Sequence, residues 1–101
     1  MLIRQITPTT GGIKPLGSET KTDLTAAGLL FTSIPAGCLG VTMTIRGGIT
    51  ITFDGTTPVV DTHHVLEPNI WTFQMETAEL AKIKAIETTS GASVYTTFWG
   101  G

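Results

Sequence analysis

The sequence predicts an all-β protein, a small antiparallel β-sandwich of jelly-roll-like form with an extended N-terminal arm. Three observations lead to this expectation. Short runs alternate between apolar and polar residues, turn signals recur at intervals of about eight to twelve residues, and no predicted helix is long enough to connect parallel strands. A chain of 101 residues is the size of one domain with a single modest core.

Residues 1–28 are predicted to form an extended arm with at most one or two short strands, and residues 29–101 the sandwich. The arm is rich in threonine, glycine, proline and serine, which favour turns and extended chain, and its apolar residues come in short islands. Such islands are too few to build a core. We therefore expect them to dock on the domain that follows or on a neighbouring subunit.

The clearest strand signals flank the Gly47-Gly48 pair. Residues 41–46 alternate between apolar side chains and threonine or arginine, and residues 49–53 alternate between isoleucine or phenylalanine and threonine. Two adjacent glycines tolerate the positive φ angles of a tight turn. The pattern predicts a hairpin in which these two strands follow each other.

The C-terminal half predicts further strands, separated by a connecting turn. Residues 69–75 and 81–85 alternate, and residues 76–80 between them can form one helical turn with Thr77 as its cap. A longer helix over residues 78–88 is the alternative, because apolar residues there also recur three apart.

Residues 93–99 are predicted to form the last strand. Its alternation places Val94, Thr96 and Phe98 on one face and Tyr95 and Trp99 on the other. Trp99 therefore either packs on its own sheet or contacts a neighbour.

The composition favours association with other protein surfaces. Charged residues make up only 14% of the chain and hydrophobic residues 41%, while threonine is abundant. A soluble protein with so few charges covers its surface with hydroxyl groups or buries part of it against a partner. We expect further copies of the chain, and another protein, as partners. The candidate interface residues are Leu2, Ile3, Ile6, Ile13 and Trp99.

The charge and cysteine content argue against other partners. The net charge is −2 and the six Lys and Arg residues are scattered, so we expect no direct nucleic-acid binding. No apolar run approaches the roughly 20 residues that span a bilayer, so no membrane partner is expected either. Cys38 is the single cysteine and is predicted to be a small buried apolar residue.

One cluster carries side chains of the kind that bind metals. Asp61, His63, His64 and Glu67 lie close together in sequence. However, neighbouring residues of an extended segment point to opposite faces, so the two histidines converge only if the backbone bends sharply. We expect one histidine to hydrogen-bond to the loop backbone and the other to face solvent. No metal site and no cofactor are predicted.

No arrangement typical of catalysis is present. Glu76 and Glu79 fall on the predicted connecting turn beside lysines, and no serine lies in a Gly-x-Ser-x-Gly elbow. We therefore predict a protein that is not an enzyme and has no catalytic residues. Two alternatives remain: a glycan-binding surface that uses aromatics such as Trp71 and Trp99, and a metal-dependent enzyme of the double-stranded β-helix type that uses His63 and His64.

A family resemblance adds to this interpretation. The stretch Ile49–Pro58 with its Asp54-Gly55-Thr56 turn, the segment Asp61–Leu66, and the run Ser90–Tyr95 resemble small virion proteins of tailed bacteriophages. The resemblance covers roughly the C-terminal half and depends on the ordered set. The family often has a more basic strand before the Asp-Gly turn, whereas this chain has Thr50-Ile51-Thr52-Phe53 there.

The resemblance implies a capsid decoration (cement) protein or a related accessory protein. Such a protein assembles in the host cytoplasm, resides in the virion, and contacts its own copies and a major capsid or other virion protein. The alternative within the same setting is a module, associated with a tail or head fibre, that binds a glycan or the host surface.

Overall fold

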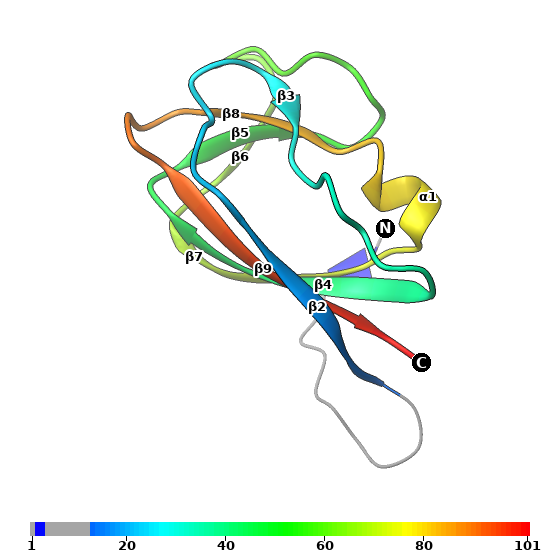
Figure 1. The fold of residues 1–101 in the computed structure, drawn as a ribbon. Coiled ribbons are helices and arrows are strands. Elements are labelled where there is room, and N and C mark those ends of the chain that lie inside the picture. Colours follow the sequence, from blue (N-terminus) through cyan, green and yellow to red (C-terminus); the bar gives the residue numbers. More distant parts are fainter. Residues whose placement is uncertain (1, 4–12) are drawn as a thin grey trace.

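The computed structural model of the chain describes residues 2–3 and 13–101, which form nine strands and one short helix (Figure 1). The strands are β1 (Leu2–Ile3), β2 (Lys14–Lys21), β3 (Gly28–Leu29), β4 (Cys38–Arg46), β5 (Ile49–Thr52), β6 (His64–Leu66), β7 (Asn69–Gln74), β8 (Lys84–Glu87) and β9 (Ser93–Gly100). The helix α1 (Thr77–Leu80) lies between β7 and β8.

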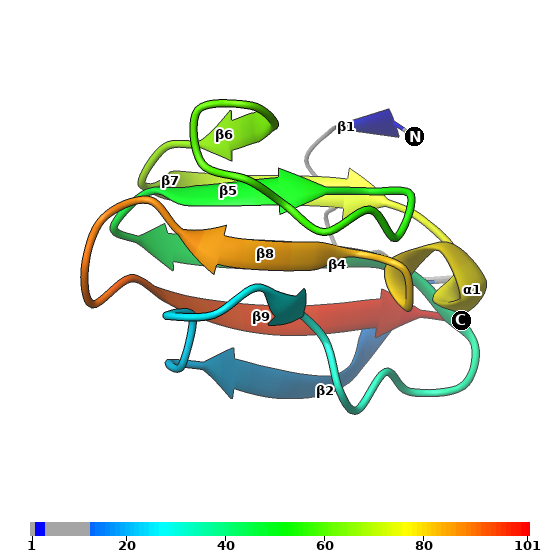
Figure 2. The same cartoon turned by 90° about the horizontal axis from the view of Figure 1, so that it is seen from above.

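The strands form two antiparallel sheets that pack face to face (Figure 2). One sheet has the order β1-β7-β4-β9-β2 and the other the order β3-β8-β5-β6. The pairings β2 with β9, β3 with β8, β4 with β7 and β5 with β6 are nested, as though one long hairpin had been wrapped around itself. This is the strand order of a jelly roll. The predicted small all-β sandwich is therefore confirmed.

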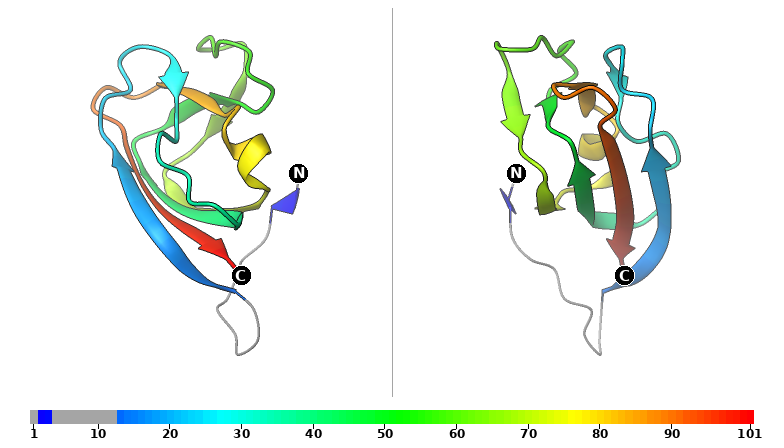
Figure 3. Two further views of the ribbon diagram at one scale, coloured as in Figure 1. Left: turned by 45° about the vertical axis from the view of Figure 1, so that its right-hand side comes forward. Right: turned by 90° about the vertical axis from the view of Figure 1, so that its left-hand side faces the viewer.

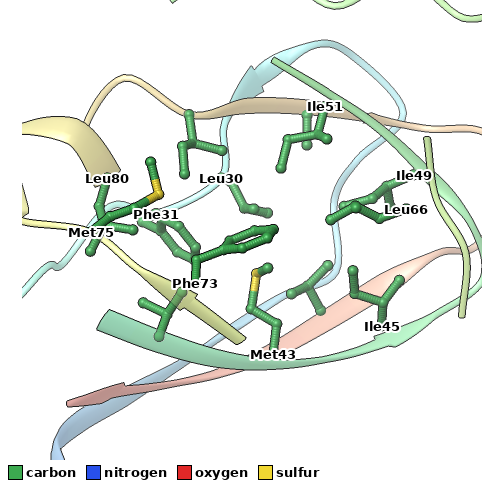
Figure 4. Packing of buried hydrophobic residues seen from close by; sticks show 14 of the residues in the cluster. Leu30, Phe31, Met43, Ile45, Ile49, Ile51, Leu66, Phe73, Met75 and Leu80 are labelled. Carbon is green, nitrogen blue, oxygen red and sulfur yellow. The ribbon is translucent and has the colours of Figure 1, made fainter. Parts of the chain in front are cut away.

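The core lies between the two sheets and is filled from the inward positions of both (Figure 4). β4 contributes Val41, Met43 and Ile45, and β5 contributes Ile49 and Ile51, all of which are buried. The alternation predicted for β4 is confirmed, because a period of two places every second side chain on the same face. In β5 the isoleucines face the core, but Thr50 and Thr52 on the other face are buried as well.

Two aromatic pairs tie connecting segments to the sheets. Phe31, from the segment between β3 and β4, meets Phe98 of β9 edge to face with ring centroids 5.5 Å apart. Phe53, just after β5, meets Phe73 of β7 in the same way at 5.5 Å. Edge-to-face pairs add to the apolar burial of each ring, so both segments are held against the core.

The hairpin predicted around Gly47-Gly48 is wrong. β4 lies in the five-stranded sheet and β5 in the four-stranded sheet, so these glycines turn a corner between sheets. Gly47 has a φ of 79°, and a Cβ there would lie 3.1 Å from Cα of Ala92. The same alternation suits both arrangements, because at a corner the apolar faces of the two strands point toward each other across the core.

The single helical turn between β7 and β8 is confirmed, and the longer helix over residues 78–88 is not formed. The predicted cap is wrong: Glu76 occupies the N-cap position with no side-chain hydrogen bond, and Thr77 is already helical. The strand predicted at residues 81–85 begins later, at Lys84. Ile83 is nevertheless buried, because the end of the turn packs it into the core.

Residues 13–28, which the sequence placed in the arm, run along the body of the sandwich. β2 pairs with β9 over most of its length and forms one edge of the five-stranded sheet, as Figure 3 shows. Leu24, which follows β2, is buried in the core. The sandwich therefore includes residues that precede Leu29.

Candidate interaction surface

The outer face of the five-stranded sheet is built from the positions that alternate with the buried ones. Because paired residues of antiparallel strands share a face, these positions line up in three rows across four strands. From β2 through β9 and β4 to β7, the rows are Thr20, Tyr95, Thr44 and Ile70; Ser18, Thr97, Thr42 and Thr72; and Pro15, Trp99, Gly40 and Gln74.

None of the residues in these three rows carries a charge. Arg46, two residues after Thr44, is the next position on the same face of β4 and lies at the margin of the three rows. We call the three rows the neutral face. Low charge at the centre of a surface is what distinguishes protein–protein interfaces from the rest of a protein surface.

Two large side chains of the neutral face, one apolar and one aromatic, are exposed. Ile70 on β7 is 65% exposed and Tyr95 on β9 is 45% exposed. They belong to the same row, with only Thr44 of β4 between them. An exposed tyrosine provides a large contact area with a polar tip, which suits a surface that meets another protein.

Hydroxyl groups hold Trp99 in place on this face. The indole Nε1–H of Trp99 donates a hydrogen bond of 3.0 Å to the hydroxyl of Thr42, and that hydroxyl lies 3.4 Å from the hydroxyl of Thr72. The ring is half-buried. The indole of Trp99 therefore lies against the outer side of the sheet, next to Thr42, and is only partly exposed on the neutral face.

The other predicted interface residues lie at the edges of the sheet or outside the described residues. Leu2 and Ile3 form β1, which pairs with Gln74 and Phe73 of β7. Ile13 is half-buried just before β2. Ile6 lies outside the described residues.

The loop that follows β5 forms a shallow cavity of about 230 Å³. The cavity is lined by Thr52, Phe53, Asp54, Thr56, His63 and His64. The loop is held by local hydrogen bonds, since the hydroxyl of Thr52 donates to the carbonyl oxygen of Thr56 and the carboxylate of Asp54 accepts from the Thr56 N–H at 3.0 Å.

The two histidines at this cavity have different environments, as the sequence predicted. The Nδ1 of His63 accepts a hydrogen bond of 2.9 Å from the N–H of Val59, which leaves Nε2 as the nitrogen that carries the proton. His64 is exposed, and its ring lies 5.9 Å from that of Phe53. Within residues 2–3 and 13–101, no group of three His, Cys, Asp or Glu side chains is placed to hold a metal ion.

The remaining tryptophan is on the inner side of its strand. Trp71 of β7 packs against the core, and its Nε1–H donates a hydrogen bond of 2.9 Å to the carbonyl oxygen of Glu67. Trp71 and Trp99 therefore lie on opposite faces of one sheet. They do not form a row of rings against which a sugar could stack.

The neutral face could be predicted only in part from the sequence. The sequence placed Tyr95 and Trp99 on the face of the last strand opposite Phe98, and the structure shows that this is the outer face. Ile70 and Thr44 were not expected to join them, because the rows depend on which distant strands pair. The low fraction of charged residues and the abundance of threonine were the signals in the sequence for such a surface.

The described part of the chain contains no helix that is long and apolar enough to cross a membrane. Comparison of the chain with protein-family models, with curated proteins and with solved structures found no match.

Proposed function

We propose that the chain is a non-enzymatic structural protein of a phage virion, a capsid decoration (cement) protein that stabilises the head through subunit–subunit contacts. The neutral face is the observation that carries this proposal. A surface of hydroxyls, one exposed tyrosine and one exposed isoleucine buries against protein without the cost of removing charges from water.

The geometry of the turns is consistent with the resemblance to small phage virion proteins. Gly55 in the Asp-Gly-Thr turn has a φ of 89°, and Gly91 in the turn before β9 has a φ of 80°. Both positions require a residue that tolerates the left-handed region, which explains why glycine recurs in the resembling segments. A jelly roll also occurs in lectins and cupins, so the fold alone does not select among these functions.

A glycan-binding module at a tail or head fibre has less support. Both indole N–H groups are occupied within the protein, and of the aromatic side chains only Tyr95 is largely exposed. Fluorescence titration with bacterial surface glycans tests this alternative: quenching of tryptophan emission that saturates at low glycan concentration would favour it over the cement function.

The cement function is tested with heads of the virus that encodes the chain, prepared without this protein. We expect the purified protein to cosediment with the heads and to raise their resistance to heat. Tyr95→Lys, in the middle of the neutral face, is expected to weaken head binding at least tenfold, because it inserts a charge into an otherwise uncharged contact.

Val65→Lys is the matched control. Val65 is 44% exposed, like Tyr95 at 45%, but it lies on β6 in the other sheet. We expect this variant to bind heads as the unmodified protein does. Failure of the unmodified protein to bind heads, together with its absence from purified virions by mass spectrometry, would overturn the proposal.

A further inference from the structure

A tight turn closes the loop between β5 and β6. The carbonyl oxygen of Val59 accepts hydrogen bonds from the N–H of Thr62 at 3.0 Å and from the N–H of His63 at 3.2 Å. A bond from an N–H to the carbonyl three residues earlier is the mark of a β-turn, here over residues 59–62. Val59 and Val60 are both exposed. The turn therefore presents two apolar side chains to solvent.

The turn holds one residue in an unfavourable backbone conformation. Asp61, the third residue of the turn, has a φ of 70°, and among the described residues it is the one non-glycine with a positive φ. A turn with a positive φ at its third residue ordinarily has glycine there, and aspartate is one of the few other residues that tolerate it. The closed turn therefore depends on hydrogen bonds that compensate for the strain at Asp61.

The side chain of His63 supplies one of these hydrogen bonds. Its Nδ1 accepts from the backbone N–H of Val59 at 2.9 Å. An imidazole nitrogen accepts a hydrogen bond only while it carries no proton, so this bond requires the neutral ring with its proton on Nε2. A proton on Nδ1 would set two donors against each other, the ring N–H and the N–H of Val59. Protonation of His63 and this bond therefore exclude each other.

The charged groups around His63 act on the protonated ring in opposite directions. Asp54 and His64 line the same shallow cavity as His63, and Asp61 lies in the turn itself. The hydroxyl and then the N–H of Thr56 hold the pKa of the Asp54 carboxyl below its ordinary value, so Asp54 is ionised throughout the range in which histidines titrate. The two carboxylates attract a charged ring at His63, whereas a protonated His64 repels it. A carboxylate is thus already present in the cavity for the charge that His63 gains in acid.

We propose that the turn at residues 59–62 is a pH-sensitive switch, closed while Nδ1 of His63 is unprotonated and opened when that nitrogen takes up a proton. In the open form the N–H of Val59 bonds to water, and Asp61 is released from its positive φ. Histidine is the side chain whose ordinary titration, near pH 6.5, gives such a change between neutral and mildly acidic solution.

The switch goes beyond the proposed function and does not depend on it. Val59 and Val60 belong to the turn, and His64, directly after His63, begins β6. Opening of the turn therefore changes the apolar surface beside the edge of the four-stranded sheet.

The test is an NMR titration of the full-length protein, labelled with nitrogen-15, from about pH 8 to about pH 5. At the upper pH we expect a scalar coupling between the backbone nitrogen of Val59 and Nδ1 of His63, because a hydrogen bond between them transmits it. At the lower pH we expect this coupling to vanish. The protection of the Val59 amide against hydrogen exchange, corrected for the intrinsic rate at each pH, is expected to fall about fivefold to tenfold.

His63→Asn separates the switch from general effects of acid. The Oδ1 of asparagine is an acceptor that can take the place of Nδ1, and it does not titrate in this range. We expect the Val59 amide of this variant to be equally protected at both pH values. His64→Asn is the matched control: it makes the same substitution at the neighbouring, exposed histidine and is expected to keep the full pH dependence.

Two results would each overturn the inference. One is a coupling and a protection factor that stay unchanged in the unmodified protein between the two pH values. The other is a pH dependence in His63→Asn equal to that of the unmodified protein. Both measurements use the chain alone, so their failure is distinct from a failure to bind heads.

Discussion

The carboxylate of Glu19 in β2 accepts hydrogen bonds from Thr32, thirteen residues further along the chain. Its two oxygens accept hydrogen bonds from the backbone N–H of Thr32 at 3.1 and 3.0 Å, and one of them also accepts from the Thr32 hydroxyl at 3.0 Å. The N–H of Ser33 adds a further bond of 3.1 Å. The residues just before Thr32, Leu30 and Phe31, are buried in the core. Glu19 therefore links the segment that contains Leu30 and Phe31, which follows β3 of the four-stranded sheet, to β2 at the edge of the five-stranded sheet.

We expect Glu19→Ala to lower the free energy of unfolding by about 1–2 kcal/mol, because it leaves two backbone N–H groups and one hydroxyl without their acceptor. Glu19→Gln keeps one acceptor oxygen in place and is expected to cost less than half as much. Urea denaturation followed by tryptophan fluorescence measures both. Equal stability of Glu19→Ala and the unmodified protein would show that water replaces the carboxylate at no cost.

The corner between the sheets depends on Gly47. Any other residue there adopts an unfavourable φ of 79° and also brings a Cβ to 3.1–3.2 Å from Ala92. Gly55 has a φ of 89° but has open space where a Cβ would lie. We expect Gly55→Ala to cost about 1 kcal/mol from backbone strain, and Gly47→Ala to cost about 1–3 kcal/mol more from crowding. Equal losses of stability for Gly47→Ala and Gly55→Ala, measured by thermal denaturation, would contradict the tight packing of Gly47 at the corner.

The prediction for β9 and the prediction for the turn at Gly47 show how much of the fold the sequence could predict. The alternation in β9 is a local property of the backbone. The predicted division into Val94, Thr96 and Phe98 on one face and Tyr95 and Trp99 on the other is confirmed, and the structure adds that the first face is the buried one. The corner at Gly47 was mistaken for a hairpin, because a turn within a sheet and a turn between sheets share the same local pattern. Which strands pair depends on packing between segments far apart in sequence, which a local pattern does not contain.

The same reason limits what could be predicted of the candidate surface. Trp99 was correctly placed on the face opposite Phe98, and one histidine was correctly expected to bond to its loop backbone. Ile70 and Tyr95 share a row only because β4 lies between β7 and β9. The role of Glu19 was not predicted at all, because an isolated glutamate in a polar segment gives no sign of its distant partner.

Cys38 is predicted to be unreactive in the native protein. Burial of the thiol raises its pKa above the ordinary value, against a smaller opposing effect of hydrogen bonds with the backbone of Gly40 and Trp99. The thiolate is the reactive form, so alkylation by iodoacetamide at pH 8 is expected to be at least tenfold slower than in denaturant. Rapid alkylation under native conditions would contradict the buried position.

The raised pKa of Cys38 also has a consequence for stability. The unfolded thiol ionises near its ordinary pKa, about 8.5, while the folded thiol resists ionisation. The stabilising effect is thus complete below about pH 8.5 and is lost as pH rises through the folded pKa. Comparison with Cys38→Ala isolates this effect: the stability difference between the two proteins is expected to shrink between about pH 8 and 10.

Asp54 is expected to give the opposite dependence, at acid pH. The hydroxyl of Thr56 and then its backbone N–H hold the pKa of the Asp54 carboxyl below the ordinary value. A lowered folded pKa stabilises the protein above the unfolded value, about 4, and this contribution is lost as pH falls through the folded pKa.

Asp54→Asn keeps an acceptor oxygen but removes the titrating charge, so its effect isolates that of the carboxylate. We expect its melting temperature to lie below that of the unmodified protein near pH 7. The gap should close as pH falls below about 4 and through the lowered pKa of the folded carboxyl, where the unmodified protein also becomes neutral at this position. Thr56→Val supplies the control, since without the hydroxyl the gap at pH 7 should narrow. A gap that stays constant from pH 7 to pH 2.5 would mean that the loop depends on the shape of residue 54 and not on its charge.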